Sequence, residues 1–259
     1  STDIITSAPQ DVGYTQIIVE LDNHNLPNQE LDLPVMTELP EKSEFGLSLI
    51  QSDPDPPMSF ASLPSQFSWK SYGGNWLTSV KDQQCGDCWD FSALGALEAS
   101  INIASGYPDL DLDLSEQYVL SCLSAAGSCN GGWMSEAIAY IQSSKTGSTG
   151  NGINGCPIES CMPYQGVDYI PCSNKCSDWD YYTTPPGQDN KLWQVKDFGV
   201  TTIAEDDPNG WNLLKTWVFE HGPIVVDIYT GGWGSYWQSH HNPTDVYEQD
   251  DSGTTNHGV

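Results

Sequence analysis

The feature that most constrains this 259-residue chain is the stretch Val80–Ser92, where two cysteines three residues apart precede a helical pattern. Cys85 and Cys88 lie in a polar turn. Apolar residues then recur at spacings of three and four: Phe91, Leu94, Leu97 and Ile101. This spacing is typical of one face of a helix. The sequence therefore predicts a buried central helix that begins at Cys88 and ends near Ser105, just before a glycine.

A thiol at the start of a helix has distinctive chemistry. It faces backbone N–H groups that have no partner in the helix and the positive end of the helix dipole. Both favour the thiolate, which is the nucleophilic form of cysteine. The same N–H groups, together with the side-chain amide of Gln83, could also hold an oxyanion. The pattern indicates nucleophilic catalysis by Cys88.

The spacing of Cys85 and Cys88 also has other interpretations. A redox pair of the thioredoxin type lies at a helix start as well. A zinc half-site uses the same gap and needs a second pair, for which Cys172 and Cys176 are the plausible residues. Ordinary buried cysteines are a fourth interpretation. The turn by itself leaves all of these open.

Charge and cysteine content limit the partners and the compartment. The chain has 35 acidic residues against 8 basic residues, all of them lysine, and a net charge of -27. Such a surface repels nucleic acid and anionic lipid, so we expect neither as a partner. No apolar run reaches 18 residues, which argues against membrane insertion. Eight cysteines are typical of a secreted or cell-envelope protein, and we expect a monomer.

Further segments predict secondary structure. Ser115 is a candidate N-cap for a helix that ends at Cys122, and a glycine-rich turn precedes another helix from Met134. A β-like run lies within Thr15–Leu21, and a second strand is expected after Pro223. An apolar helical stripe is expected to pack in the core: Trp211, Leu214, Trp217 and Val218.

Several of these stretches together resemble the papain/cathepsin (C1) family of cysteine peptidases. The turn around Cys88 matches the local signature of that family. The other segments that carry the resemblance are Leu114–Gln117, Cys129–Met134, Met162–Gly166 and Asn256–Val259.

The resemblance implies an α+β, papain-like fold with a helical lobe, a β-rich lobe and an active-site cleft between them, its last strands missing. Residues 63–259 would form the peptidase domain, with the helical lobe at about 80–186. The β lobe would take about 63–79 and 187–259, and residues 1–62 would be an N-terminal extension or pro-region of a zymogen.

The same resemblance implies roles for individual residues. The catalytic residues would be Cys88 as nucleophile, His257 as general base and Gln83 in the oxyanion hole. Glycines would let an extended substrate pair closely with the enzyme, and Trp133 with Met134 would form an apolar wall. The residues implied in substrate binding are Gly86, Trp89, Gly131, Gly132, Trp133, Met134, Asn256 and Gly258.

Disulfide pairing is also implied by the family. Cys85 would pair with Cys129, and Cys122 with Cys172. The partners of three cysteines stay open: Cys156, Cys161 and Cys176. Because the nucleophile must stay free, one more thiol is left without a partner in the chain.

The implied function is hydrolysis of peptides or proteins through a thioester, with no metal and no cofactor. The sequence departs from the family pattern at four points, and two of them, the aspartates Asp87 and Asp90 and the missing C-terminal residues, support an alternative: a pseudopeptidase that binds peptides without cutting them. The Gln83–Cys88 turn is one residue short, and the spacing from Cys88 to His257 is long. Asp87 and Asp90 stand where small neutral residues are usual, so their charge opposes the thiolate. The residue that orients His257 would lie beyond Val259.

Overall fold

The computed structural model describes residues 12–18, 63–142, 155–182, 189–195, 197–203, 208–228 and 256–259. Its helices are α1 (Cys88–Ser105), α2 (Glu116–Cys122), α3 (Met134–Gln142) and α4 (Gly210–His221), with short 3-10 turns η2 (Glu159–Cys161) and η3 (Cys172–Asn174). Its strands are β1 (Val12–Ile18), β2 (Gly127–Ser128), β3 (Gly131–Gly132), β4 (Cys156–Pro157), β5 (Leu192–Trp193), β6 (Asp197–Ile203), β7 (Ile224–Ile228) and β8 (His257–Gly258). The α+β prediction is confirmed.

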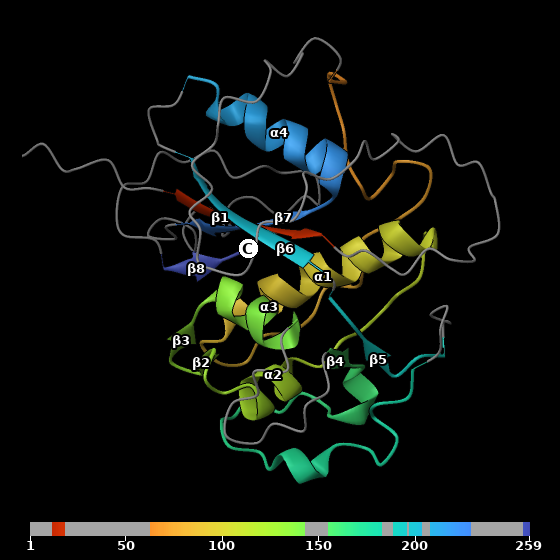
Figure 1. Cartoon of the computed structure of the whole chain (residues 1–259), viewed down its shortest axis with the longest axis vertical. Coiled ribbons are helices and arrows are strands. Elements are labelled where there is room, and N and C mark those ends of the chain that lie inside the picture. Colours follow the sequence, from red (N-terminus) through yellow and green to blue (C-terminus); the bar gives the residue numbers. More distant parts are fainter. Residues whose placement is uncertain are drawn as a thin grey trace, which may run out of the picture.

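The largest sheet has the strand order β6-β1-β7-β8, and each neighbouring pair is antiparallel. In Figure 1, α4 covers one side of this sheet, whereas α1 and α3 lie on the other. The strand predicted within Thr15–Leu21 is β1, shifted towards the N-terminus. Tyr14 lies opposite both Thr201 and Val226, so this strand is an inner strand of the sheet. The rest of 1–62 lies outside the described residues.

The helix that begins at Cys88 is the central element of the described structure. It ends at Ser105 as predicted, because Gly106 takes the left-handed conformation (φ 69°) and its N–H bonds back to the last turn. Leu94, Leu97 and Ile101 are fully buried. Each such side chain contributes about 1.5–3 kcal/mol relative to exposure. Twelve of the eighteen residues of the helix are buried, so it is packed on most of its faces.

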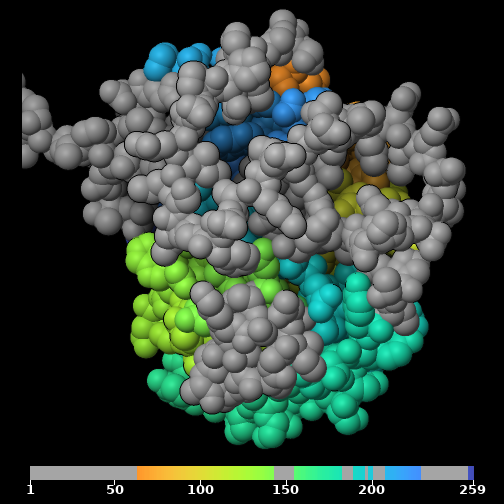
Figure 2. All heavy atoms as spheres, in the orientation of Figure 1, coloured from red at the N-terminus to blue at the C-terminus, as the bar shows by residue number. Residues whose placement is uncertain are grey.

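The other helices pack around α1 to form a helical lobe. Ser115 caps α2 as predicted, since its hydroxyl accepts a hydrogen bond from the Tyr118 N–H at 3.0 Å. The buried face of α3 is the predicted one: Met134, Ala137, Ile138 and Ile141. Segment 155–182 forms the rounded lower end of the molecule, away from α4 (Figure 2).

Aromatic side chains join the segment after residue 63 to α4. Phe67 lies edge-on to Trp69 and to Phe219, with ring centroids 5.0 and 4.8 Å apart. The Trp69 indole N–H donates to the carbonyl of Val218 at 2.6 Å. The first residues of the predicted peptidase domain therefore pack on the sheet side of the molecule.

The prediction that the apolar stripe of α4 packs in the core is wrong for Trp211, which is 74% exposed. Leu214, Trp217 and Val218 are only partly buried, and the buried residues of α4 are Gly210 and Thr216. Within the described residues, no helix combines the length and the apolar character that crossing a membrane requires.

Candidate active site

The structure places Cys88 as predicted, at the first residue of α1. Its thiol is half-buried and free, and Cys156 is the other free thiol among the described cysteines. Asp87 is the N-cap residue, but its side chain makes no capping hydrogen bond in the described structure. The sulfur therefore lies where the first-turn N–H groups and the helix dipole favour a negative charge.

Three disulfides decide between the interpretations of the Cys85–Cys88 spacing. Cys85 pairs with Cys129 and Cys122 with Cys172, both as implied. Because Cys85 is bonded elsewhere, a redox pair with Cys88 is contradicted. A zinc site is contradicted as well, since a metal needs thiolates and three of the four sulfurs it would use are in disulfides.

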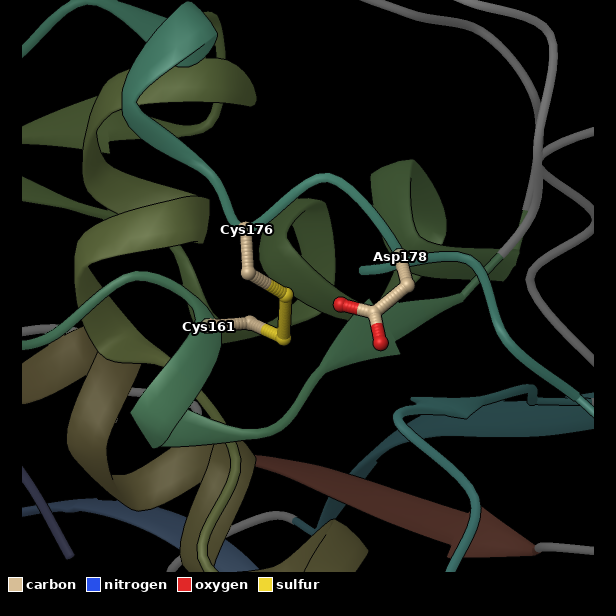
Figure 3. Close-up of side chains that lie close together, drawn as sticks. All are labelled: Cys161, Cys176 and Asp178. Atoms are coloured by element: carbon tan, nitrogen blue, oxygen red, sulfur yellow. A yellow bond between two sulfur atoms is a disulfide. The ribbon is translucent and has the colours of Figure 1, made fainter.

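The third disulfide joins Cys161 to Cys176 and leaves Cys156 free and buried. Figure 3 shows the Asp178 side chain directed towards this disulfide. The carboxylate and the two sulfurs lie within 4.8 Å of one another. Because the sulfurs are bonded to each other, neither is a thiolate available to a cation. This pairing resolves the cysteines that the sequence left open.

His257 lies on strand β8, which runs along the start of α1, the helix that carries Cys88. β8 pairs with β7, with Ile228 opposite His257. The neighbouring Gly258 touches the helix so closely that a Cβ there would lie 3.5 Å from the carbonyl oxygen of Cys88 and 2.8 Å from the Ser92 hydroxyl. A glycine is therefore needed next to the histidine. Burial lowers the pKa of His257 from its ordinary value.

A cavity of about 260 Å³ opens next to Cys88. It follows one face of α1, and its walls also include the loop before the helix and the strand that carries His257. The lining residues are Thr78, Ser79, Lys81, Gln83, Cys88, Phe91, Ser92, Gly95, Glu98, Gly258 and Val259. Two of the three predicted catalytic residues, Cys88 and Gln83, thus line it directly, and Gly258 brings the third next to it.

The Gln83 amide is fixed within the shortened loop. Its Nε2 donates to the carbonyl of Cys85 at 2.7 Å. The loop is tied to the facing hairpin where the Gly86 N–H donates to the Cys129 carbonyl at 3.0 Å. A Cβ on Gly86 would lie 2.5 Å from that same oxygen, so the two backbones require a glycine there.

The glycines that were predicted to pair with an extended substrate lie in the hairpin β2–β3. Gly131 is exposed, with φ 118° and open space where a Cβ would be. Gly132 packs flat on Trp89, whose ring is 2% exposed and would lie 2.5 Å from a Cβ on that glycine. The Trp89 indole N–H also donates to the Ser128 carbonyl at 3.2 Å. Trp89 therefore packs against the hairpin, and its ring has almost no surface that a substrate could contact.

The two side chains after the glycines have different environments. Trp133 is 68% exposed, whereas Met134 is buried at the start of α3. The Met134 sulfur lies 2.8 Å from a Cβ position on Gly258, which joins this wall to the histidine strand. Asn256 is exposed, and its N–H donates to the Ile228 carbonyl at 2.9 Å.

Both unusual aspartates beside the thiol are buried. Asp87 accepts from the Tyr164 hydroxyl at 2.9 and 3.1 Å, and burial raises its pKa. Asp90 is fully buried, neither carboxylate oxygen has a hydrogen-bond partner among the described residues, and burial raises its pKa well above the ordinary value. Because the neutral form is favoured, Asp90 adds less negative charge beside Cys88 than the sequence implies.

A charged cluster around Lys81 forms part of the cavity wall. The Lys81 ammonium contacts the carboxylates of Glu98, Glu116 and Asp113, the last two at 2.8 Å. Glu98 and Glu116 raise the pKa of Lys81 against the effect of its burial. One lysine cannot neutralise two buried carboxylates, so burial raises the pKa of Glu116 to about 8 although Lys81 opposes the shift.

Sequence reasoning missed some residues around Cys88. Phe91 and Ser92 line the cavity because they lie three and four residues after Cys88, on the same face of α1. The helical spacing in the sequence could have identified them. Tyr164 reaches the loop from far along the chain. It lies in a segment that the family resemblance had singled out, but no local signal shows which way its hydroxyl points.

Comparison with known proteins agrees with this geometry. The sequence model of the papain family cysteine proteases matches residues 63–259. Cathepsin L1 of Drosophila melanogaster is 34% identical over 195 residues, covering 68% of this chain and 49% of the relative. Cathepsin L2 of Homo sapiens is 31% identical over 186 residues, covering 64% of this chain and 52% of the relative. The chain thus spans about half the length of these curated relatives.

Solved structures give the same result at the level of the fold. A crystal structure of the proform of the Amb a 11 cysteine protease, a major ragweed pollen allergen, aligns with a TM-score of 0.54 and 27% identity. The alignment covers 80% of this chain and 48% of that one. A structure from a study of the mite allergens Blo t 1 and Der p 1 aligns with a TM-score of 0.52 at 23% identity, covering 79% of this chain and 58% of that one.

Proposed function

The chain belongs to the papain family of cysteine proteases, and from this premise we propose that it is a cysteine endopeptidase that cleaves proteins or peptides. The observation that carries the proposal is a free thiol at the N-terminus of α1, in one cavity with Gln83 and Gly258 and next to the strand of His257. A thiolate, an amide donor and an imidazole are the groups that acyl transfer through a thioester requires.

In the proposed mechanism, the Cys88 thiolate attacks the peptide carbonyl and forms a tetrahedral oxyanion. The first-turn N–H groups and the Gln83 amide stabilise this oxyanion. His257 as imidazolium protonates the leaving amine, and a water molecule then hydrolyses the thioester. The lowered pKa of His257 fits a group that gives up its proton readily.

The substrate would lie extended along the β2–β3 hairpin. Gly131 is exposed with no side chain, so its backbone is accessible to a substrate backbone. The exposed Trp133 ring offers an apolar surface beside it, which supports a preference for apolar or aromatic substrate side chains. Three disulfides support action in an oxidising compartment, outside the cytoplasm.

We also propose that residues 1–62 act as a pro-region, because the family match begins at residue 63. Cleavage near Leu63 would remove the inner strand β1, so β6 and β7 would have to rearrange in the cleaved protein. Acid incubation followed by N-terminal sequencing tests this, and a new N-terminus near Leu63 is expected. A fully active protein that keeps residue 10 contradicts it.

The test of activity is titration of the protein with an irreversible epoxide inhibitor of cysteine peptidases. We expect one equivalent to label Cys88 and to abolish cleavage of a peptide with an apolar residue two before the scissile bond. The Cys88→Ser variant is the control, and it should neither label nor cleave. Labelling of the buried Cys156 instead, or cleavage that survives Cys88→Ser, contradicts the proposal.

A further inference from the structure

One hydroxyl group links three parts of the loop that carries the nucleophile. The Tyr164 Oη donates to the Asp87 carboxylate, at 2.9 Å from Oδ2 and 3.1 Å from Oδ1. It also accepts a hydrogen bond from the backbone N–H of Gln84 at 3.2 Å. Gln84 and Asp87 lie just inside the two ends of the turn from Gln83 to Cys88. A side chain from a distant segment therefore holds both ends of that turn.

Tyr164 is itself held in place on three sides. Its ring lies edge-on to Phe91 of α1, with centroids 4.9 Å apart and planes at 89°. Its own N–H donates to the Glu159 carboxylate at 2.6 Å. Two residues on, Gly166 packs so tightly that a Cβ there would lie 2.9 Å from the Cβ of Gln84. The hydroxyl is therefore directed at the loop by contacts with Phe91 and Glu159, which lie outside the loop, and by the close approach of Gly166 to Gln84.

The bond to Tyr164 changes what Asp87 does. An aspartate at an N-cap ordinarily accepts from the second or third N–H of its helix. Asp87 occupies the N-cap of α1, yet within the described structure its side chain makes no such bond and bonds Tyr164 instead. The N–H groups of the first turn, on which both the Cys88 thiolate and an oxyanion depend, are thereby kept clear of a competing carboxylate.

We propose that Tyr164 is a positioning residue for catalysis, which holds the Asp87 carboxylate away from the helix N-terminus and braces the shortened loop that carries Gln83. The proposal rests on Cys88 being the nucleophile assigned above. It explains how this chain accommodates an acidic residue directly before its reactive thiol.

The charges around Asp87 agree with this role. Burial raises the pKa of Asp87, the hydrogen bond from Tyr164 lowers it, and the charge of Asp168 raises it. Asp90, one turn along α1, also interacts with it. The Tyr164 hydroxyl and the backbone N–H of Asp87 itself thus favour the anionic form of Asp87, and losing the hydroxyl leaves the carboxylate free to turn towards the first turn of the helix.

The test measures the rate of Cys88 alkylation by iodoacetamide against pH, read by mass spectrometry of the Cys88 peptide. Alkylation needs a thiolate but no peptidase chemistry, so its result is independent of the proposed function. With Tyr164→Phe we expect the pH midpoint of alkylation to rise by about one unit, a roughly tenfold slower reaction below the midpoint. Asp87→Asn is isosteric and uncharged, and should move the midpoint down.

The double variant is the decisive arm. If Tyr164 acts through the Asp87 carboxylate, adding Tyr164→Phe to Asp87→Asn should leave the midpoint where Asp87→Asn alone puts it. Tyr118→Phe is the control for the loss of a tyrosine hydroxyl elsewhere in the helical lobe and should keep the midpoint of the unaltered protein. In cleavage assays Tyr164→Phe should lower kcat more than it changes KM.

Two results would overturn the proposal. One is an alkylation midpoint in Tyr164→Phe equal to that of the unaltered protein. The other is an undiminished shift when Tyr164→Phe is added to Asp87→Asn. If Tyr164→Phe does not fold, the Asp87→Asn variant alone tests the proposal. An alkylation midpoint in Asp87→Asn equal to that of the unaltered protein would mean that the Asp87 carboxylate has no influence on the Cys88 thiol, which overturns the proposal. If the alkylation midpoints shift as expected but the protein cleaves no peptide, the peptidase function is refuted and the positioning role of Tyr164 is still supported.

Discussion

Asp90 offers the sharpest test of the electrostatics beside the nucleophile, through the variants Asp90→Ala and Asp90→Asn. Its carboxyl group is 0% exposed and has no hydrogen-bond partner among the described residues. Burial is the main cause of its raised pKa, and Glu116, Asp87 and Glu159 add to the effect while Lys81 opposes it. The folded protein therefore holds a proton that the unfolded chain releases.

The sign of the pH dependence follows from this difference. A carboxyl whose pKa is raised by folding contributes its full stability below its unfolded pKa, and this contribution is lost as the pH rises towards the folded pKa. The loss is about 1.4 kcal/mol of unfolding free energy for each pH unit over which Asp90 stays protonated in the folded protein but is ionised in the unfolded chain. Neither variant has a titrating group at this position. As the pH rises, the unfolding free energy of both variants should therefore increase by that amount relative to the unaltered protein.

The two variants also separate charge from hydrogen bonding. Asp90→Asn keeps a buried polar group without partners, whereas Asp90→Ala removes it and should be about 1–3 kcal/mol more stable than Asp90→Asn at every pH. The cavity left by alanine offsets roughly 0.5 kcal/mol of this gain. The difference in unfolding free energy between the two variants should therefore not change with pH.

The assay is urea unfolding followed by tryptophan fluorescence at pH 4.5, 5.5 and 6.5. Asp111→Asn serves as the matched control, because the Ser79 hydrogen bonds lower the pKa of this exposed carboxylate. The contribution of Asp111 to the unfolding free energy is lost as the pH falls, whereas that of Asp90 is lost as the pH rises. Parallel curves of unfolding free energy against pH for the unaltered protein and both Asp90 variants would refute the reasoning.

Three further changes test other parts of the site. Lys81→Met leaves two buried carboxylates without a cation and should lower the unfolding free energy by about 3–5 kcal/mol at neutral pH and less in acid, measured by urea titration at both pH values. Replacing Cys85 and Cys129 by serine opens a loop of 44 residues and should cost about 4 kcal/mol, read from the shift in thermal midpoint. Gly132→Ala drives a methyl group into the Trp89 ring and should reduce kcat/KM for peptides without changing epoxide labelling. Unchanged values in these assays would contradict the respective contacts.

Local patterns predicted the elements that position the nucleophile. The apolar spacing after Cys88 and the glycine at 106 fixed both ends of α1, and the hydroxyl of Ser115 marked the start of α2. These signals work because helix ends depend on residues within a few positions of each other. The family resemblance added the two disulfide pairs, which spacing alone leaves undetermined.

Other features depend on contacts between distant segments and were not predictable. The sequence places Asp90 near the thiol but does not show that it is buried without partners. The Tyr164 hydroxyl and the Cys161–Cys176 disulfide each result from the path of segment 155–182. Trp211 follows a core-like spacing and is nevertheless exposed, because the spacing shows which residues share a face of α4 but not how closely that face packs.

The inner position of β1 determines the order in which the molecule can assemble. Its partners β6 and β7 begin only at Asp197 and Ile224, so during synthesis this strand has no partner in the sheet until those residues have emerged. The helical lobe needs only nearby partners and can form earlier, because short loops close quickly while distant strand pairing is slow. Until β1 docks, the edges of β6 and β7 stay open to other extended chains, which makes this interval the period of greatest risk of aggregation.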